Sequence, residues 1–378
     1  MKNTVVVAVV KEEEPGLLAL TGGEAKSLVP VFGGARVMDF YLAPFMGGSW
    51  GEVHVLAGKG MHAVKEHLGL TYPSGRIRVV DDGDLWTALA ATGSRRGCEN
   101  MLLLRAEGML FADWEKAGGQ LDALPPGVYP LVMAGARVGF FLSGRRVPCD
   151  PDPESSAGNG ACAVDRVWET LEERLLDEAE GRVVQLSGAW HPLATVFEYF
   201  RTHMHILDNL EGYLPRFQPL SGDGFRRGGR NVATSQIGKY ALVQDSYIPH
   251  SCTIQGEVVH TVLFPRVRIA RNVRVENSNI LGPNHLAEGS TVLNTILCGS
   301  PVRAVPTVGE GARIGGNEQG GQNESYPDTL HGGITLIGRN VEVPRGCRIA
   351  GNCYIGPGVD RSMLKSRKLI RSGTSITA

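Results

Sequence analysis

Residues 337–359, IGRNVEVPRGCRIAGNCYIGPGV, decide the fold of the second half of the chain. Small apolar side chains recur in it at every sixth position, in two interleaved series: Ile337, Val343, Ile349 and Ile355, and Val341, Cys347, Cys353 and Val359. A six-residue period with glycine, proline or asparagine between the apolar positions is typical of a parallel β-helix, in which three short strands form one coil of a triangular prism. Each coil buries its apolar side chains against those of the next coil. The period predicts a left-handed parallel β-helix of hexapeptide repeats.

The same period continues toward the N-terminus and sets the limits of this domain. It is first met at Ile237 and Val243, so we expect the β-helix to occupy residues 236–378. The period is lost across residues 299–333, which include the polar run GNEQGGQNESYPDTLHGG. We therefore expect a polar insertion at about 299–333 that leaves the prism. Loops of this length are usually functional or mobile.

The first half of the chain alternates between two patterns. Apolar, β-branched runs predict strands at residues 5–10, 52–57, 76–80 and 101–104, and helical spacing predicts helices at 39–45, 62–68, 85–91, 167–178 and 195–210. Strands that alternate with helices are typical of βαβ units on a sheet covered on both faces. We expect a Rossmann-like α/β domain with a mostly parallel sheet over residues 1–210, joined to the β-helix by a polar, glycine-rich linker at 211–235.

Length, charge and cysteine content limit the classes of protein that fit this sequence. A chain of 378 residues is long enough for two domains. The formal net charge of −1 gives no electrostatic basis for nucleic-acid binding. No apolar run approaches the ~18 residues of a membrane span. Seven cysteines, without a CxxC pair, favour reduced thiols, and we expect a cytoplasmic protein that binds neither nucleic acid nor membranes.

Three segments resemble the ADP-glucose pyrophosphorylase family, in the family's order along the chain. They are AKSLVPVFGGARVMDFYLAP at residues 25–44, AWHPLATVFEYFRTHMHIL at 189–207 and VVHTVLFPRVRIARNVRVENSNILGPN at 258–284. The resemblance implies a nucleotidyltransferase domain followed by a β-helix domain, the same order as the patterns above. It also implies the family's activity, which joins glucose 1-phosphate to ATP and releases pyrophosphate to give ADP-glucose for glycogen synthesis.

The segment after the first strand, KEEEPGLLAL at residues 11–20, departs from the family. The resemblance implies a glycine-rich loop here, with an arginine, whose backbone N–H groups hold the triphosphate. The segment has neither paired glycines nor an arginine. Its three glutamates at 12–14 would repel the phosphates by ~1 kcal/mol for each well-screened pair of like charges. A shortened loop at residues 21–23 (TGG), followed by Lys26, is the alternative alignment.

The positions that hold the metal in the family are also altered. Phosphoryl-type transfer needs Mg²⁺ held by carboxylates, and the resemblance implies two aspartates for it. The first position matches Glu107, whose additional methylene moves the carboxylate by about 1 Å, a distance that matters in catalysis. The second position matches Pro192, which cannot ligate a metal. We assign no cofactor to the chain, and expect Mg²⁺ at Glu107 only if the protein is active.

Three candidate site residues remain near the start of the chain. The resemblance implies that Lys26 approaches the substrate phosphates and that Arg36 and Asp39 lie at the start of the following helix. Lys26 and Asp39 are therefore the candidate substrate-binding residues, and Lys26, Arg36 and Glu107 are the vestigial catalytic candidates. The alternatives are a surface position for Lys26 and a structural i,i+3 ion pair between Arg36 and Asp39.

Three functions remain open on this sequence. The first is a non-catalytic or weakly active member of the family, which forms homo-oligomers, or hetero-oligomers with an active pyrophosphorylase, and binds a sugar phosphate or nucleotide as a regulatory or assembly subunit. The second is an active sugar-1-phosphate nucleotidyltransferase with a rearranged Mg²⁺ site. The third is a hexapeptide-repeat acyltransferase, whose catalytic histidine would come from His250, His260 or His285 on or near the coils.

Overall fold

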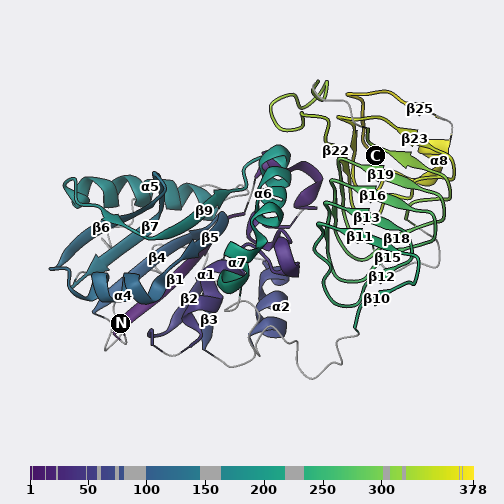
Figure 1. Ribbon diagram of the computed structural model, residues 1–378. Helices are drawn as coiled ribbons and strands as arrows, with labels where there is room; N and C mark the ends of the chain where they lie inside the picture. Colours follow the sequence, from purple (N-terminus) through teal and green to yellow (C-terminus); the bar gives the residue numbers. More distant parts are fainter. Residues whose placement is uncertain are drawn as a thin grey trace.

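The computed structural model describes residues 1–378 except for residues 2, 13, 23, 48, 58–60, 73–75, 81–98, 145–162, 218–233, 301–306, 317–320, 366 and 368. An α/β domain made by the first half of the chain lies beside a β-helix made by the second half (Figure 1). Helix α6 (Val196–Asp208) lies between the two. Within the described part of the chain, every helix falls short of the length and apolarity that a membrane span requires.

The α/β domain is built on a seven-stranded sheet with the strand order β3-β2-β1-β4-β7-β6-β8. Strand β1 pairs in parallel with β2 and β4, whereas β7 is antiparallel to β4 and β6. The strands are β1 (Thr4–Val10), β2 (Val53–Leu56), β3 (Ile77–Val80), β4 (Asn100–Ala106), β6 (Gly127–Met133), β7 (Ala136–Ser143) and β8 (Val184–Gln185). The next strand in the chain, β2, lies on one side of β1, and β4 lies on the other side, so the strand order reverses between β1 and β4. Open α/β sheets bind ligands in the crevice at the carboxyl ends of the strands where this reversal occurs.

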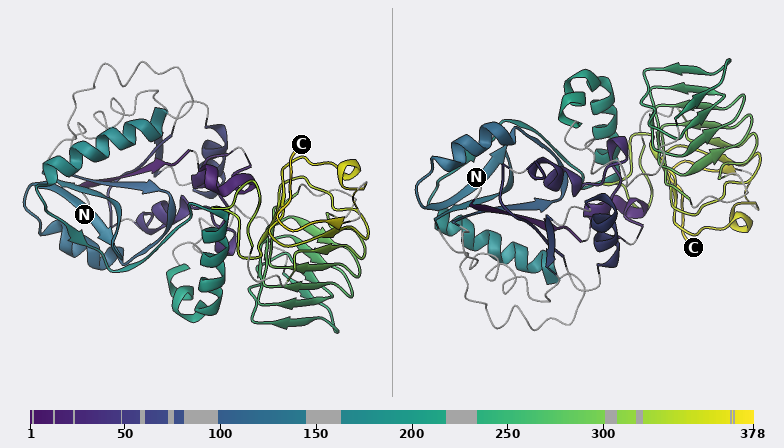
Figure 2. Two further views of the ribbon diagram at one scale, coloured as in Figure 1. Left: turned by 90° about the horizontal axis from the view of Figure 1, so that it is seen from above. Right: turned by 90° about the horizontal axis from the view of Figure 1, so that it is seen from below.

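Strand β1 is buried at every position, so both faces of this sheet are covered. Val5, Val7 and Val9 share a core cluster with Trp168 and Leu171 of α5 (Ala163–Ala179), which lies along one face of the sheet (Figure 2). The alternate side chains of β1 belong to a second cluster on the other face. The remaining helices of the domain are α1 (Asp39–Leu42), α2 (His62–Thr71), α4 (Trp114–Asp122) and α7 (Leu210–Phe217), with 3₁₀ turns η1 (Pro15–Leu20), η2 (Lys26–Leu28), η3 (Phe32–Gly34) and η4 (Ala43–Phe45).

A two-stranded antiparallel ribbon leaves the carboxyl end of β4. It is formed by β5 (Gly108–Ala112) and β9 (Gly188–Pro192), and its register places Gly108 opposite Pro192. This pairing was not predicted from the sequence. A Cβ on Gly108 would lie 2.5 Å from the main-chain oxygen of His191, so the close approach of the two strands requires glycine there.

The β-helix consists of three parallel sheets, with strand orders β10-β12-β15-β18, β11-β13-β16-β19-β21-β23-β25 and β14-β17-β20-β22-β24-β26. The coils stack in register, and this places Leu263, Ile280, Leu297, Ile337 and Ile355 in one buried column. The strands are β10 (Gln236–Ile237), β11 (Leu242–Gln244), β12 (Thr253–Ile254), β13 (Glu257–Val259), β14 (Val262–Leu263), β15 (Val267–Ile269), β16 (Arg274–Glu276), β17 (Asn279–Ile280), β18 (Asn284–Leu286), β19 (Thr291–Leu293), β20 (Thr295–Leu297), β21 (Arg313–Ile314), β22 (Thr335–Ile337), β23 (Arg348–Ile349), β24 (Tyr354–Ile355), β25 (Leu369–Ile370) and β26 (Ser375–Ile376), with α8 (Arg361–Lys365) before β25. The predicted fold class is therefore confirmed.

The predicted insertion at 299–333 is wrong in its middle part. Strand β21 lies inside that range and pairs with β19 and β23 of the prism. Val308, Ala312 and Ile314 are completely buried in the prism core. Residues 321–333 lie against the prism as well, because the buried amide of Asn323 donates to the main-chain oxygens of Asn352 and Gly373. The period was hidden in this range because the sequence on either side of the coil that contains β21 lacks it.

The segment between the domains differs in part from the expected linker at 211–235. Helix α7 covers its first residues, 211–217, and the first coil of the prism begins at β10. The intervening residues 218–233 lie outside the described part of the chain.

The two domains share one apolar core. The outward side chains of the sheet that contains β14 and β22, among them Val262, Ile296 and Leu336, belong to the same cluster as Leu20 and Tyr199 of the α/β domain. The rings of Phe32 and Tyr247 also meet across this boundary, with their centroids 4.5 Å apart. The α/β domain therefore packs on one face of the prism.

Candidate functional site

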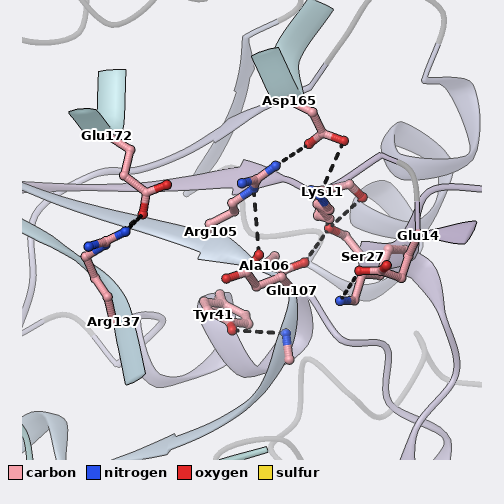
Figure 3. Close-up of polar contacts among 12 residues, drawn as sticks. Lys11, Glu14, Ser27, Tyr41, Arg105, Ala106, Glu107, Arg137, Asp165 and Glu172 are labelled. Atoms are coloured by element: carbon pink, nitrogen blue, oxygen red, sulfur yellow. Dashed lines mark hydrogen bonds and ion pairs between the residues drawn. The ribbon is translucent and has the colours of Figure 1, made fainter. Parts of the chain in front are cut away.

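Charged side chains gather at the carboxyl ends of β1 and β4, in the crevice that the sheet topology predicts for a ligand (Figure 3). Lys11 directly follows β1, and Arg105 and Glu107 come from the end of β4 and the residue after it. Lys26, on η2, is near enough to Glu107 for its charge to act on that carboxyl. With Glu14 and Asp165 they form the group of six residues that we call the ion cluster.

Asp165, at the start of α5, holds two cations of the ion cluster. Its Oδ1 accepts a hydrogen bond from Arg105 Nη2 at 2.7 Å, and its Oδ2 is 3.7 Å from Lys11 Nζ. Asp165 and Arg105 are both buried, and the Arg105 guanidinium also lies 5.7 Å from the centre of the Trp168 ring. The short distance and the burial make this a fixed ion pair of the domain.

Glu14 holds the third cation. Lys26 Nζ donates to Glu14 Oε2 at 2.9 Å, and the Lys26 side chain is only 4% exposed. The Glu14 side chain is 21% exposed and comes from the segment between β1 and η1. The sequence alternative of a surface position for Lys26 is therefore wrong.

Backbone N–H groups beside the ion cluster donate to atoms of the protein. The Lys11 N–H donates to Ser27 Oγ at 2.8 Å, and the Lys26 N–H donates to the main-chain oxygen of Glu12 at 2.9 Å. Ser27 Oγ in turn donates to the main-chain oxygen of Ala106 at 2.8 Å and so joins the ends of β1 and β4. A phosphate cradle needs amide groups that point at the ligand, and these two point into the fold.

Glu107 lies among the cations Arg105, Lys26 and Lys11. Its Oε2 is 3.9 Å from Arg105 Nε, and burial raises the pKa of its carboxyl although Arg105, Lys26 and Lys11 oppose the rise. The register of β5 and β9 brings Pro192 opposite Gly108, next to Glu107 in sequence. Among the described residues, no three His, Cys, Asp or Glu side chains gather into a possible metal site. One carboxylate surrounded by cations does not suit Mg²⁺, which is bound through carboxylates and neutralises their charge.

Asp39 and Arg36 lie away from the ion cluster and hold the local backbone. Asp39 is completely buried at the start of α1, and its carboxylate accepts hydrogen bonds from the Arg36 backbone N–H, His67 Nε2 and Tyr72 OH at 2.7, 2.8 and 2.9 Å. The Arg36 side chain donates to the main-chain oxygen of Leu28 at 2.6 Å. These contacts fit the alternative that Arg36 and Asp39 have a structural role. The hydrogen bond between them comes from the backbone N–H of Arg36.

The alternative phosphate loop at residues 21–23 forms part of the domain boundary. Gly22 has φ +57° and approaches the β-helix so closely that a Cβ on it would lie 2.8 Å from Arg339 Nε. Arg339 also pairs with Glu24 at 3.5 Å. Gly23 lies outside the described residues. The turn thus contacts the prism instead of forming an open loop at Lys26.

Of the histidines proposed for acyl transfer, His260 has side-chain partners within the protein. His260 Nε2 lies 2.8 Å from Asp208 Oδ1, and its Nδ1 lies 3.1 Å from Asn277 Oδ1. Burial, followed by the charge of Arg268, lowers the pKa of His285. These contacts join the coils to one another and to α6.

A cleft of about 610 Å³ lies beside the ribbon, lined by aromatic side chains that include Phe40, Phe111 and Trp114, with Asp113 and Arg216 also at its wall. Its lining includes no member of the ion cluster among the described residues. We therefore place the candidate site at the ion cluster, where sheet topology and charge coincide.

The structure brings together Lys26 and Glu107, two of the four residues predicted for the site. The sequence analysis missed Arg105 and Asp165. A signal for Arg105 was present, because an arginine in the otherwise apolar run MLLLRA (101–106) needs a buried partner. Nothing local pointed to Asp165, which lies 60 residues further along the chain.

Comparison with known proteins agrees with the architecture. Residues 230–337 match the family model described as GlmU-like, C-terminal hexapeptide. The chain is 26% identical over 188 residues to a glucose-1-phosphate adenylyltransferase of Acetivibrio thermocellus, covering 47% of this chain and 40% of the relative. It is 24% identical over 222 residues to the enzyme of that name from Desulfitobacterium hafniense, covering 53% and 52%. A glucose-1-phosphate adenylyltransferase of Thermomicrobium roseum is 24% identical over 191 residues, covering 50% and 42%.

The matches cover about half the length of these curated relatives, or somewhat less. The family model places the hexapeptide repeats in the second half of the chain, where the six-residue period predicted them. These similarities support the assignment to the ADP-glucose pyrophosphorylase (glucose-1-phosphate adenylyltransferase) family that the segments of the sequence indicated.

Proposed function

We propose that this chain is a non-catalytic or weakly active ADP-glucose pyrophosphorylase-like protein that acts as a regulatory or assembly subunit in sugar-nucleotide and glycogen metabolism. The observation that carries the proposal is the charge balance of the ion cluster. Lys11, Lys26 and Arg105 each lie within 4 Å of a carboxylate of the chain itself, either Asp165 or Glu14.

This balance opposes a reacting nucleoside triphosphate. A triphosphate would compete with Asp165 for Arg105, and would leave a buried carboxylate without its partner. Breaking a buried ion pair in this way costs about 3–5 kcal/mol. The Lys11 and Lys26 N–H groups are turned into the fold, and the carboxylate of Glu107 does not suit Mg²⁺, so neither offsets this cost.

The partners we propose are a second copy of this chain or an active pyrophosphorylase, and the ligand is a sugar phosphate or a nucleotide. The retained β-helix supports an assembly role, since it keeps a continuous apolar core and a large surface. The similarity to glucose-1-phosphate adenylyltransferases supports the link to glucose 1-phosphate and to adenylyl transfer.

Exchange of radiolabelled pyrophosphate into ATP, in the presence of ADP-glucose and Mg²⁺, tests the loss of catalysis. We expect the purified chain to show less than about a thousandth of the exchange rate of an active pyrophosphorylase, which corresponds to about 4 kcal/mol of lost transition-state stabilisation. Exchange at the rate of the active enzyme would contradict the proposal and support the rearranged-site alternative.

The regulatory part is tested by mixing the chain with an active pyrophosphorylase. We expect co-elution in size-exclusion chromatography and a changed KM or maximal rate of the active partner. If the chain neither co-elutes nor alters those kinetics, and binds no sugar phosphate or nucleotide, the regulatory role is wrong.

A further inference from the structure

Lys26 is the most deeply buried ammonium group of the ion cluster. Its side chain is 4% exposed, compared with 18% for that of Lys11. An ammonium group so far from water needs an anion within contact distance, because desolvation otherwise disfavours its charge. In the structure this anion is the Glu14 carboxylate, 2.9 Å from Nζ.

The two carboxylates that neutralise the ion cluster differ in how firmly they are held. Asp165 is 6% exposed, binds two cations and stands on α5, which Trp168 and Leu171 anchor in a core cluster. Glu14 precedes η1, contacts Lys26, and leaves 21% of its side chain exposed. Rotation of the Glu14 side chain into solvent leaves its carboxylate hydrated, whereas the Asp165 carboxylate is buried and bound to two cations.

We infer that Glu14 is an internal anion that occupies Lys26 in place of a ligand's phosphate, and that inorganic diphosphate is the kind of anion that can replace it. This assignment rests on the proposed function and adds the contact that controls access to the site. A diphosphate suits the crevice because Lys26 and the partly exposed Lys11 both act on the carboxyl of Glu107, so one phosphate group can bind Lys26 while the other remains near Lys11. In the wild-type chain, Glu14 competes effectively with free diphosphate for Lys26, because it belongs to the same chain and already lies beside Lys26.

The test is to remove the charge of Glu14 and then to offer pyrophosphate without Mg²⁺. We expect Glu14→Gln to be less stable than wild type in pyrophosphate-free buffer. We expect its Tm to rise by about 3–5 °C at a pyrophosphate concentration about 100 times the dissociation constant. The wild-type Tm should move by less than about 1 °C at the same concentration.

Two further variants show whether the effect arises at Lys26. The double variant Glu14→Gln, Lys26→Met removes both charges and should lose the pyrophosphate response. Glu310→Gln frees Arg345, which lies 3.4 Å from Glu310 on the exposed surface of the prism, and should show no response. If Glu14→Gln does not fold, Glu14→Asp keeps the charge but shortens the side chain, and should show a smaller pyrophosphate shift.

Two results would overturn the inference. One is a folded Glu14→Gln variant whose Tm is unaffected by pyrophosphate, and the other is a response that persists in the double variant. Neither result bears on the exchange assay of the wild-type chain, which tests catalysis. An active wild-type enzyme would contradict the proposed function while leaving the competition between Glu14 and diphosphate to be decided by these variants.

Discussion

At the scale of single residues, the carboxyl of Glu107 shows how burial and charge oppose each other in the ion cluster. Burial raises its pKa, and the nearby cations Arg105, Lys26 and Lys11 only partly reverse the effect. The folded chain therefore binds this proton more tightly than the unfolded chain does. The stability that Glu107 contributes is full below the usual pKa of 4.5 and is lost as pH rises through the raised pKa.

The variant Glu107→Gln tests this balance, because the amide is neutral at every pH. At pH 7 we expect a higher free energy of unfolding for the variant than for wild type. The difference should shrink as the pH falls to about 4, where the wild-type carboxyl is protonated as well. Urea unfolding monitored by circular dichroism, at pH 4 to pH 8, measures it.

The matched control for this prediction is Glu310→Gln, which removes an exposed carboxylate of the prism. Exposed ion pairs contribute about 0–1 kcal/mol, so this variant should stay close to wild type. A Glu107→Gln variant that is less stable than wild type at pH 7 would mean that the attraction of the cations outweighs burial.

At the scale of secondary-structure elements, the turn between β6 and β7 carries an avoidable strain. Its two residues, Ala134 and Gly135, have φ of +49° and +83°, the conformation of a type I′ hairpin turn. Glycine adopts this region freely, but alanine pays about 1–2 kcal/mol for it because of its Cβ. Asparagine tolerates the region, and the prism uses it in this way at Asn272, Asn277, Asn294, Asn340 and Asn352, all with positive φ.

We expect Ala134→Asn to stabilise the chain by about 0.5–1 kcal/mol, since it creates the Asn-Gly pair favoured in two-residue hairpins. Ala134 is exposed, so the new side chain displaces no core atoms. Thermal unfolding should show a higher Tm. The opposite change, Gly135→Ala, should lower stability by about 1 kcal/mol although nothing lies within 4 Å of the added Cβ. A lower Tm for Ala134→Asn would show that the turn is not a limiting strain.

At the scale of the whole molecule, His203 on α6 lies in the core shared by the two domains. It is completely buried, and its ring centre lies 6.4 Å from that of Phe32 and 6.1 Å from that of Phe264 in the β-helix. Its Nδ1 lies 2.7 Å from the main-chain oxygen of Tyr199. Burial lowers the pKa of His203 to about 4, with His191 as a further lowering influence and the Tyr199 bond opposing it.

Acid should therefore weaken the shared core. The folded pKa lies below the usual value of 6.5, so the stability from neutral His203 is full above pH 6.5 and is lost as pH falls toward 4. At pH 5 the loss from this residue is about 2 kcal/mol. The variant His203→Asn, whose amide can still donate to Tyr199, should show a weaker fall of urea midpoint between pH 7 and pH 5. His205→Asn, at an exposed position of the same helix, should keep the wild-type pH dependence. Equal pH dependence in His203→Asn and wild type would exclude this origin.

The parts of the fold that could be predicted are those in which the polarity of each residue indicates whether its side chain is buried. The six-residue period predicted the prism because every coil repeats the same inward position, as at Ile337 and Ile349. The strand β1 was predicted because it is apolar throughout. The coil that holds β21 was missed, since the sequence on either side of it lacks the six-residue period. The ribbon of β5 and β9 was missed because it joins segments about 80 residues apart in the chain.

By itself, the sequence determined the α/β domain, the β-helix and the presence of Lys26 and Glu107 at one edge of the sheet. Local hydrophobic pattern is sufficient for the two domains, because burial acts on each side chain according to its place in a strand or coil. The positions of Lys26 and Glu107 came from the resemblance to the family. Only the tertiary structure decided which carboxylate faces which cation: Asp165 reaches Arg105, and Glu14 covers Lys26. Ion pairs depend on distances of a few ångströms between segments remote in the chain, and the periodicity of a sequence carries no information about such distances.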